Sequence, residues 1–435
     1  MAVTIHGIEP RSRAERAGIR PGDVLVSING HEIIDVLDYR FFETERELRL
    51  SLTRQGEPYQ VELVKPQYAE IGLGAEWLER HNEEEVKAVI QRCESYGINI
   101  LDCWMSNPEV RTKIGNAICG HREKWVIQGH FGSTWQEGQY VRTRDLPKVK
   151  EAFQDLLTRL QTDYIDLGMI HFVDSEAEFR QVMEGEFLAY VKEQREKGVI
   201  RHIGMSTHNP QVAKLAALSG EIEMLLFSVN PAFDLLPPSE DLNDYFVESY
   251  GEGLAGIDPL REELYKLCEQ RGVGITVMKG YAGGRLFDAR TSPFGVALTP
   301  VQCLHYALTR PAVASVLVGY DTPAHVDAAV AYEAATEEER DYASVLAKAP
   351  RHAYSGQCTY CGHCAPCPAG IDIAMVNKLY DLAAMQPEVP ATVRAHYQAL
   401  SATAADCIAC GGCETRCPFG VPVVERMEKA KALLG

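Results

Sequence analysis

The chain has 435 residues, of which 46% are hydrophobic, enough for two or three domains with a large core. Its 61 acidic residues outnumber its 43 basic ones, and the net charge of −18 disfavours binding to nucleic acid or an anionic membrane, which need a basic face. The start of the chain lacks the pattern of a signal peptide, and no apolar run approaches the length of a membrane-spanning helix. We therefore expect a cytoplasmic protein.

Residues 1–66 are expected to form a small β-rich domain. Segments such as DVLVSI and YQVELV run or alternate apolar at strand length, and Asn29-Gly30 and Gln55-Gly56 mark turns between strands. The stretch AGIRPGDVLVSING resembles the core of a bacterial, permuted PDZ domain. Because PDZ domains accept an extended peptide at a sheet edge, the resemblance implies a peptide or protein partner. The alternative is a spacer that docks on the rest of its own chain.

Residues 67–347 alternate short apolar strands with amphipathic helices. The predicted strands are AEIGLG, INILD, WVIQG, YIDLGMIH, RHIGMS, EMLLFSV, VGITVM and ASVLVG. Three of the predicted helices begin with Pro after a capping residue, at Asn209, Thr299 and Thr322. Eight β-then-α units predict a (β/α)8 TIM barrel, whose usual size is about 250 residues. The long connection at 231–257 is typical of a lid or a binding element.

Residues 348–435 carry the clearest chemical signal. Residues 358–368 read CTYCGHCAPCP and residues 407–418 read CIACGGCETRCP. Each run has three Cys at two-residue gaps and then a Cys directly before Pro, which is the pattern of two-cluster ferredoxins. In those proteins the fourth Cys of each run ligates the other cluster. Zinc sites do not have this overlapping pattern, and disulfides would need an oxidising compartment.

We therefore predict two [4Fe–4S] clusters in an α-helical domain of bacterial-ferredoxin type. The ligands of one cluster are Cys358, Cys361, Cys364 and Cys417, and those of the other are Cys407, Cys410, Cys413 and Cys367. The five remaining cysteines are scattered singly, as expected for buried thiols in a reducing cytoplasm. The predicted fold class is α/β: a TIM barrel with an N-terminal PDZ-like domain and this C-terminal domain.

Catalytic residues of such a barrel lie at the carboxyl ends of its strands. In chain order these positions hold Glu76, Asp102, His130, His171, Ser206, His208, Asn230 and Lys279. Three of the eight are histidines that follow consecutive strands, and Asp102 can serve as their carboxylate partner. Imidazole groups move protons or bind metals near neutral pH, so these four residues are the predicted centre of the site.

The segments GINILD, LLTRLQTDYIDLGMIH, KGVIRHIGMSTHNP and MKGYAGGRL resemble the aldo-keto reductase superfamily, in its branch with a C-terminal ferredoxin-like domain. The resemblance runs from residue 69 to the end. It implies reduction of a carbonyl by a tetrad of Asp, Tyr, Lys and His, of which Asp102 and His171 match. Asn107 stands at the position of the Tyr, and His130 at that of the Lys. Because an amide is no acid, His130 is the expected substitute, with Asp102 holding its tautomer and His171 bonding the substrate oxygen.

The residues that hold a nicotinamide in the family are poorly matched. Leu226 and Met278 align with the positions that bind its carboxamide and stack on its ring. Asp321, after the last strand, would repel the 2′-phosphate of NADP. The remaining candidates for cofactor binding are Ser206, Asn230, Lys279 and Gly319. The resemblance thus disfavours NADPH and leaves NAD(H) or flavin open, although the sequence has no doubly wound dinucleotide fingerprint.

The leading hypothesis is an anaerobic iron–sulfur oxidoreductase that acts on a small carbonyl or hydroxyl compound. Its clusters would exchange electrons with a ferredoxin or other redox protein, and they would lie within tunnelling reach of the open end of the barrel. One alternative is an NAD(H)-dependent reductase with structural clusters. Another is a lyase, isomerase or hydrolase with a metal held by the three histidines and Glu76 or Asp102. The last is a non-enzymatic, redox-sensing PDZ scaffold.

Overall fold

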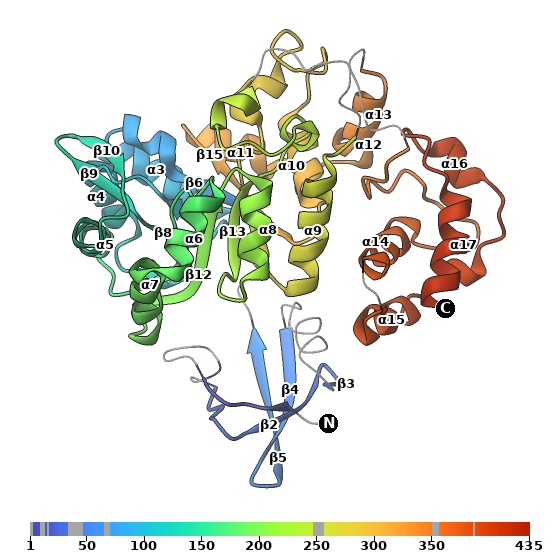
Figure 1. Cartoon of the computed structure of the whole chain (residues 1–435), viewed down its shortest axis with the longest axis horizontal. Coiled ribbons are helices and arrows are strands. Elements are labelled where there is room, and N and C mark those ends of the chain that lie inside the picture. Colours follow the sequence, from blue (N-terminus) through green and yellow to red (C-terminus); the bar gives the residue numbers. More distant parts are fainter. Residues whose placement is uncertain are drawn as a thin grey trace. The chain divides into compact units, whose positions relative to one another are not determined.

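The computed structural model describes residues 3–8, 14, 17–33, 47–64, 70–246, 256–349, 356–385 and 388–435. The chain separates into two compact units, Met1–Tyr68 and Ala69–Gly435 (Figure 1). The predicted domain boundary at residues 66–67 and part of the predicted connection at 231–257 lie outside the described residues.

The first unit contains an antiparallel sheet. Its strands are β1 (Val3–Thr4), β2 (Val24–Ile28), β4 (Glu47–Arg54) and β5 (Glu57–Val64) in that spatial order, and β3 (His31–Glu32) pairs with β2. Apolar side chains of β2 and β4, among them Leu25, Ile28 and Leu52, form its core. Hydrogen bonds from Arg54 hold the pKa of the buried Asp23 carboxyl far below its usual value, so this ion pair ties a turn to the end of β4.

The second unit contains a closed barrel of eight parallel strands, which confirms the predicted TIM barrel. The strands are β6 (Ile71–Gly74), β7 (Ile100–Cys103), β8 (Val126–Phe131), β11 (Ile165–Ile170), β12 (Ile200–Thr207), β13 (Met224–Ser228), β14 (Gly274–Met278) and β15 (Val313–Gly319). The outer helices are α3 (Glu83–Ser95), α4 (Pro108–Ile118), α5 (Leu146–Arg159), α6 (Glu176–Glu184), α7 (Glu186–Glu196), α8 (Pro210–Leu218), α9 (Pro259–Arg271), α10 (Pro300–Leu308) and α11 (Pro323–Val330).

The barrel strands are buried on both faces because helices cover the outside and side chains fill the inside. The interior layer includes Ile100, Leu167, Met169, Leu226 and Leu317. Two polar side chains satisfy each other across the barrel, since Gln128 Nε2 donates to Thr276 Oγ1 at 2.8 Å. The packed interior leaves the chemistry to the two ends of the barrel.

The predicted helix caps are confirmed at two of three positions. The side chains of Asn209 and Thr299 accept backbone hydrogen bonds at the starts of α8 and α10. Thr322 precedes α11 but makes no such bond, so its predicted capping role is wrong. The prediction of buried single thiols fails at Cys119, which is exposed because it follows the last turn of α4.

A β-hairpin that the sequence analysis did not predict follows β8. It consists of β9 (Ser133–Gln136) and β10 (Gln139–Arg142), joined at Glu137-Gly138, both with positive φ. Two adjacent residues of this kind form the tight turn that matches the twist of a hairpin. Trp135 and Tyr140 are cross-strand partners, each 37% exposed. The hairpin thereby carries an aromatic pair at the carboxyl end of β8.

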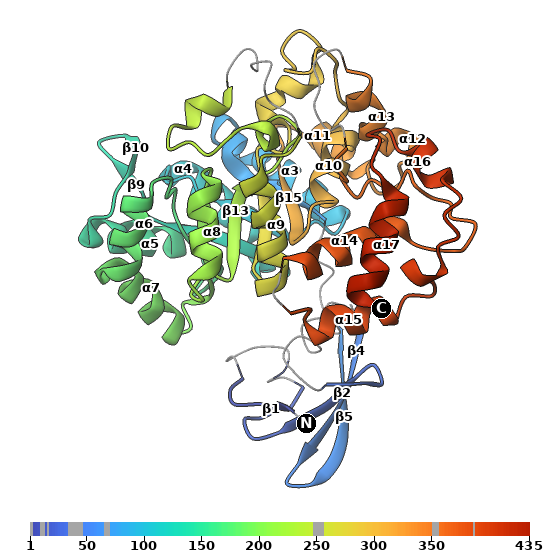
Figure 2. The same cartoon turned by 45° about the vertical axis from the view of Figure 1, so that its right-hand side comes forward.

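The C-terminal region is helical, as predicted. Its helices are α14 (Ile373–Ala384), α15 (Ala391–Gln398), α16 (Gly412–Arg416) and α17 (Val423–Leu434), and α12 (Glu337–Arg340) and α13 (Tyr342–Ala347) precede it. Helix α14 lies alongside α9 of the barrel in both views (Figures 1 and 2). Lys378 forms an ion pair with Glu269, and Gln270 Nε2 donates to the carbonyl of Leu382 at 3.0 Å. In the part of the chain described, no helix is both long and apolar enough to cross a membrane.

The packing between α4 and α5 can be tested by a substitution at Gly115. A Cβ at this buried position would clash with the carbonyl oxygen of Arg159. Gly→Ala inside a helix ordinarily gains roughly 0.5–1 kcal/mol. Because overpacking costs about 1–3 kcal/mol, we expect Gly115→Ala to lower the free energy of unfolding instead. Urea unfolding measures this change, with Asn116→Ala on the exposed face of the same helix as the control. A Gly115→Ala protein as stable as the unmodified one would contradict the packing.

Candidate active site

Three of the predicted site residues meet at the carboxyl ends of neighbouring strands. Asp102 lies in β7, His130 in β8, and His171 directly follows β11. Asp102 Oδ1 is 2.8 Å from His130 Nε2, and His130 Nδ1 is 2.9 Å from His171 Nδ1. All three side chains are at least 94% buried, because Asp102 is 4%, His130 2% and His171 6% exposed. Both ring nitrogens of His130 are therefore occupied within the protein.

The hydrogen-bonded series continues to a residue that the sequence analysis missed. Tyr140 Oη, on the hairpin, is 2.7 Å from His171 Nε2. With 37% of Tyr140 exposed, the series leads from a buried carboxylate to a phenol at the surface. We call these four residues, Asp102, His130, His171 and Tyr140, the relay. The alternation of STWQEGQYVR about Glu-Gly is the signal that would have indicated the hairpin.

One arrangement of hydrogens satisfies all three bonds of the relay. His130 Nε2–H donates to the Asp102 carboxylate, His171 Nδ1–H donates to His130 Nδ1, and Tyr140 O–H donates to His171 Nε2. In this arrangement both imidazoles are neutral. Burial, followed by electrostatic interactions with His130 and Arg144, lowers the pKa of His171 well below its usual value, in agreement with a neutral ring.

The ring of His171 is held on several sides. Trp104 stacks on it with an interplanar angle of 12° and a centroid distance of 5.7 Å, and the same indole meets the edge of Tyr140 at 5.3 Å. Arg144 donates to the backbone carbonyl of His171 at 2.6 Å. Ser206, a predicted cofactor residue, accepts a bond from Phe172 N at 2.7 Å. These contacts fix the turn that presents the imidazole.

A second histidine system lies at the end of β12. His208 Nδ1 is 2.9 Å from Asp174 Oδ2, and its backbone N–H donates to Asp174 Oδ1 at 2.7 Å. Burial lowers the pKa of His208, while the bond to Asp174 opposes the shift. Among the described residues, His208 Nε2 has no hydrogen-bond partner. Asp174, which lies directly before Ser175, the N-cap residue of α6, was not among the predicted site residues.

The other predicted residues have separate environments. Asn107 lies outside the relay, where it caps α4 by accepting a bond from Glu109 N at 3.0 Å. Asn230 is fully buried, and its Nδ2 donates to the backbone carbonyl of Lys279. Burial lowers the pKa of Lys279, and Glu76 opposes that shift. Asn230 therefore joins two loops at the end of the barrel.

The region after β15 is filled by side chains of the segment that follows β6. A Cβ on Gly319 would clash with the indole of Trp77. Arg80 stacks on that indole at 3.9 Å from its centroid. Asp321 forms an ion pair with His81, which raises the pKa of the imidazole. Trp77 thus packs directly on Gly319, the predicted cofactor residue, and His81 engages the carboxylate of Asp321.

Four cysteines of the C-terminal region line one small cavity: Cys358, Cys361, Cys364 and Cys417. This is the set drawn from both runs that the sequence predicted, and Phe419, Val421 and Val423 complete an apolar wall. Four thiols around an apolar cavity fit an iron–sulfur cluster. Within the described ranges, no group of three or more His, Cys, Asp or Glu is spaced to hold a single metal ion. His130 and His171 in particular bond each other directly.

The second set of cysteines lies nearer the surface. Cys413 is buried, Cys367 and Cys407 are partly buried, and Cys410 is exposed. Ile408, between two of these residues, is 66% exposed. The two sets therefore differ in their access to solvent.

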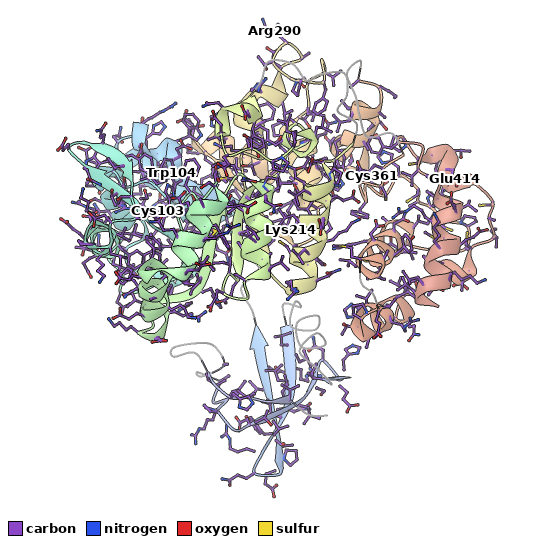
Figure 3. The ribbon with its side chains drawn as sticks, in the orientation of Figure 1. Cys103, Trp104, Lys214, Arg290, Cys361 and Glu414 are labelled. Carbon is purple, nitrogen blue, oxygen red and sulfur yellow. The ribbon has the colours of Figure 1, made fainter. Side chains whose placement is uncertain are left out.

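The C-terminal region packs on the side of the barrel opposite the relay. Arg310 and Tyr342 donate to the carbonyl of Thr359, and Gln357 Nε2 donates to Glu262 at 2.9 Å. Arg310 precedes β15 and Glu262 lies in α9, whereas the relay begins on β7, β8 and β11, across the closed barrel. Trp104 and Cys361 accordingly appear on opposite sides of the barrel in Figure 3. The cavity lined by the first set of cysteines lies beside the last helices of the barrel, because the C-terminal region directly follows these helices in the chain.

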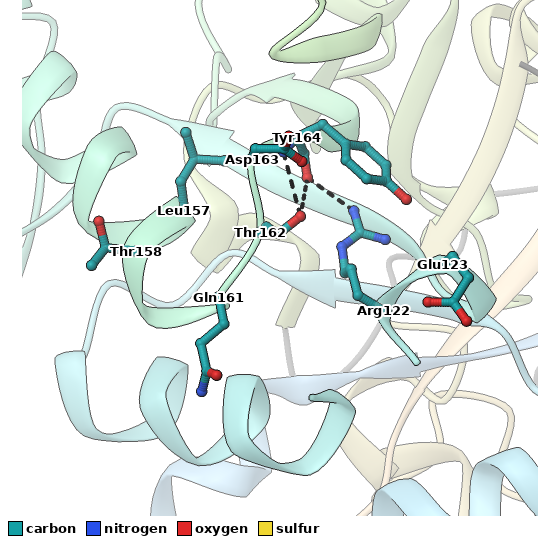
Figure 4. Close-up of a pocket in the computed structure, with 8 residues that line it drawn as sticks. All are labelled: Arg122, Glu123, Leu157, Thr158, Gln161, Thr162, Asp163 and Tyr164. Carbon is teal, nitrogen blue, oxygen red and sulfur yellow. Dashed lines mark hydrogen bonds between the residues drawn. The ribbon is translucent and has the colours of Figure 1, made fainter. Parts of the chain in front are cut away.

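A shallow hollow at the opposite, amino end of the strands has no comparable chemistry (Figure 4). It lies between the end of α5 and the start of β11 and contains Arg122 and Tyr164. The guanidinium of Arg122 is engaged by Asp166 at 2.8 Å and by the carbonyl of Tyr164 at 3.1 Å. These bonds tie a loop to β11, which is a structural role.

A parallel barrel with titratable groups at the carboxyl ends of its strands defines a TIM-barrel enzyme. Residues 70–300 match the model of the aldo/keto reductase family, and the chain belongs to that family of oxidoreductases. Residues 4–42 match a PDZ domain, and residues 328–421 match a 4Fe-4S dicluster domain, as the sequence predicted.

The relatives cover mainly the barrel. The chain is 28% identical to the uncharacterized oxidoreductase YqkF of Bacillus subtilis over 265 residues, which are 58% of this chain and 82% of the relative. It is 32% identical to the aldo-keto reductase YhdN of the same species over 95 residues, 21% of this chain and 27% of the relative. Among solved structures, the holo form of aldo-keto reductase AKR11C1 from Bacillus halodurans aligns with a TM-score of 0.48 and 24% identity, covering 62% and 89% of the two chains.

The buried relay has a consequence for the pH dependence of stability. The unfolded chain protonates His171 near pH 6.5, whereas burial delays this protonation in the folded protein. Below about pH 6.5 the unfolded state therefore binds more protons, and this residue lowers stability as the pH falls. We expect ¹⁵N-histidine NMR to show His171 titrating below pH 6.5 and His81, whose pKa is raised by Asp321, titrating above it. Protonation of His171 at a higher pH than His81 would contradict the relay.

Proposed function

We propose that the protein is an iron–sulfur oxidoreductase that interconverts a small carbonyl compound and its alcohol at the open end of the barrel. The observation that carries this proposal is the relay. A carbonyl oxygen that becomes a hydroxyl needs a proton, and the relay connects a surface phenol to a buried carboxylate through two imidazoles. It would replace the Tyr and Lys of the family, at whose positions the resemblance places Asn107 and His130.

Electrons would pass through two [4Fe–4S] clusters, which supply them one at a time. The first cluster would be held by the four cysteines that line the small cavity, Cys358, Cys361, Cys364 and Cys417. The second cluster would be held by Cys407, Cys410, Cys413 and Cys367. The exposure of Cys410 and Ile408 supports the second cluster as the contact for a ferredoxin or similar redox protein. In this division of work the domains are residues 1–66, 67–347 and 348–435.

A series of buried contacts supports a route from the first cluster to the mouth of the barrel. Thr359, beside Cys358, accepts a bond from Tyr342, whose ring meets the edge of Tyr306 at 5.2 Å. Tyr306 Oη donates at 2.7 Å to Asp234, in the loop after β13. Each of these side chains is at most 1% exposed. A substrate between this loop and the relay would complete the route.

The two histidine systems also fit electron transfer by clusters. Reduction of a carbonyl by two single electrons consumes two protons, one on oxygen and one on carbon. Hydride transfer would bring the hydrogen on carbon together with the electrons. His208, held by Asp174 apart from the relay, is the proposed source of the proton on carbon.

The place of the C-terminal region favours a second candidate, an NAD(H)-dependent reductase in which the clusters are structural. The C-terminal region packs on the side of the barrel away from the relay, and Ser206 lies near the carboxyl end of β12. The ion pair of Asp321 and the cover of Trp77 over Gly319 disfavour NADPH in either case. A flavin stays open, as does a peptide partner for the PDZ domain, of which residues 34–46 lie outside the described residues.

The two candidates predict different electron donors. We expect anaerobic protein with a panel of aldehydes and ketones to turn over with reduced methyl viologen or reduced ferredoxin, and not with NADPH. Turnover with NADH alone, unaffected by loss of the clusters, would instead establish the second candidate. His208→Gln is expected to lower kcat by about 100-fold or more in the viologen assay, because the proton on carbon is lost. An unchanged rate would remove His208 from the mechanism.

The ligand sets predict which cysteines act together. We expect about eight iron atoms per chain, and loss of about four on replacement of either Cys364 or Cys417 by Ala. Both variants should lose the same electron paramagnetic resonance signal, while Cys367→Ala should lose the other. Cys119→Ala, at an exposed thiol outside the clusters, serves as the control. Loss of different signals in Cys364→Ala and Cys417→Ala would contradict the shared cavity.

A further inference from the structure

The relay ends in a group that the sequence did not identify, and its position defines a more specific role. His130 and His171 each use both ring nitrogens within the relay, and they are 2% and 6% exposed. Tyr140 uses its hydroxyl hydrogen toward His171, which leaves the oxygen lone pairs facing outward. Of the four relay residues it is the one with a substantially exposed side chain.

We propose that Tyr140 is the residue that exchanges a proton with the substrate oxygen, and that His171 and His130 act through it. This inference rests on the proposed function. Trp104 and the hairpin partner of β10 hold the phenol in place, since the Trp104 indole meets its edge at 5.3 Å and β9 pairs with β10 along its length. Tyr140 is thus the proposed proton donor. It lies on a different element from Asn107, the residue that the resemblance places at the position of the family's Tyr.

The transfer balances within the relay. Before reduction the relay holds one more proton than in the arrangement described above: His130 is a cation beside the Asp102 carboxylate, and His171 Nε2–H donates to Tyr140. The Tyr140 O–H bond breaks and a new O–H bond forms on the substrate oxygen. Tyr140 then takes the Nε2 proton of His171, and His171 Nδ1 takes the Nδ1 proton of His130. The two electrons would come from the reduced iron–sulfur clusters, and the proton on carbon from His208.

The end state of this transfer is the arrangement that satisfies every hydrogen bond with neutral imidazoles. In that state the Tyr140 oxygen accepts, so the same relay receives a proton when an alcohol is oxidised. Burial raises the pKa of Tyr140, although Arg142 and Arg144 oppose the shift. The raised pKa keeps the phenol protonated at neutral pH. The lowered pKa of His171 agrees with an imidazole that stays neutral throughout the transfer.

Tyr140→Phe tests this role, with Trp135→Phe as the matched control on the facing strand of the same hairpin. In the anaerobic viologen assay with aldehydes and ketones, we expect Tyr140→Phe to lower kcat by about 100- to 10,000-fold with little change in KM, and Trp135→Phe to leave kcat unchanged. Incorporation of 3-fluorotyrosine at position 140 should restore turnover and shift the pH profile of kcat, because the acidity of the phenol changes. A structural role alone would not produce that shift.

The hydrogen bond itself has a readout that needs no turnover. In ¹⁵N-histidine NMR, the Nε2 signal of His171, assigned with His171→Gln, should move in Tyr140→Phe and stay in place in Trp135→Phe. If it does not move, the relay ends at His171 and the inference is wrong. If the wild-type protein reduces a carbonyl compound and Tyr140→Phe has the same kcat as Trp135→Phe, the role of Tyr140 is contradicted and the proposed function still stands. If the wild-type protein reduces no carbonyl compound, the proposed function fails, and the role of Tyr140 fails with it.

Discussion

A carboxylate buried at the end of a barrel strand must be hydrogen-bonded, and this constraint shapes the candidate site. Asp102 is 4% exposed, where an unpaired charge would cost several kcal/mol. His130 satisfies it, and the second nitrogen of that imidazole must then find a partner of its own, which is His171. The remaining nitrogen of His171 is satisfied by the phenol of the hairpin. Each bond in the relay therefore follows from the burial of the group before it, until the series reaches solvent.

The same constraint acts at Asp234 with a different outcome. This fully buried carboxylate accepts bonds from Tyr265 at 2.5 Å and Tyr306 at 2.7 Å, next to the equally buried Arg261. Burial raises the pKa of Asp234, and Arg261 opposes the shift. All of its partners are themselves buried, so the network fixes the loop after β13 and offers no group to a substrate. Chemistry is expected where a buried network ends in an accessible atom, as at Tyr140.

The parts of the structure that the sequence predicted depend on local periodicity or on topology. Alternating strands and helices indicated the barrel, and the rule that catalytic residues follow parallel strands brought Asp102, His130 and His171 together before any distance was known. The cysteine spacing likewise predicted that Cys417 joins the first run. Tyr140 was missed because its approach to His171 depends on how a hairpin folds over the neighbouring strand. The position of the C-terminal region was missed for a similar reason, since it depends on the packing of α14 against α9, which no motif records.

The separation of the clusters from the relay follows from what protons and electrons require. A proton moves between atoms in hydrogen-bond contact, so its donor must touch the substrate, and the relay reaches the mouth of the barrel through bonds of 2.7–2.9 Å. An electron can cross packed side chains without such contact, so a cluster can remain on the outer flank beside Tyr342 and Tyr306. The substrate would then meet its protons from β7, β8 and β11 and its electrons from the side of β14 and β15. Under the proposed function, the barrel would keep the strand-end chemistry of its family while the C-terminal region would supply a different source of electrons.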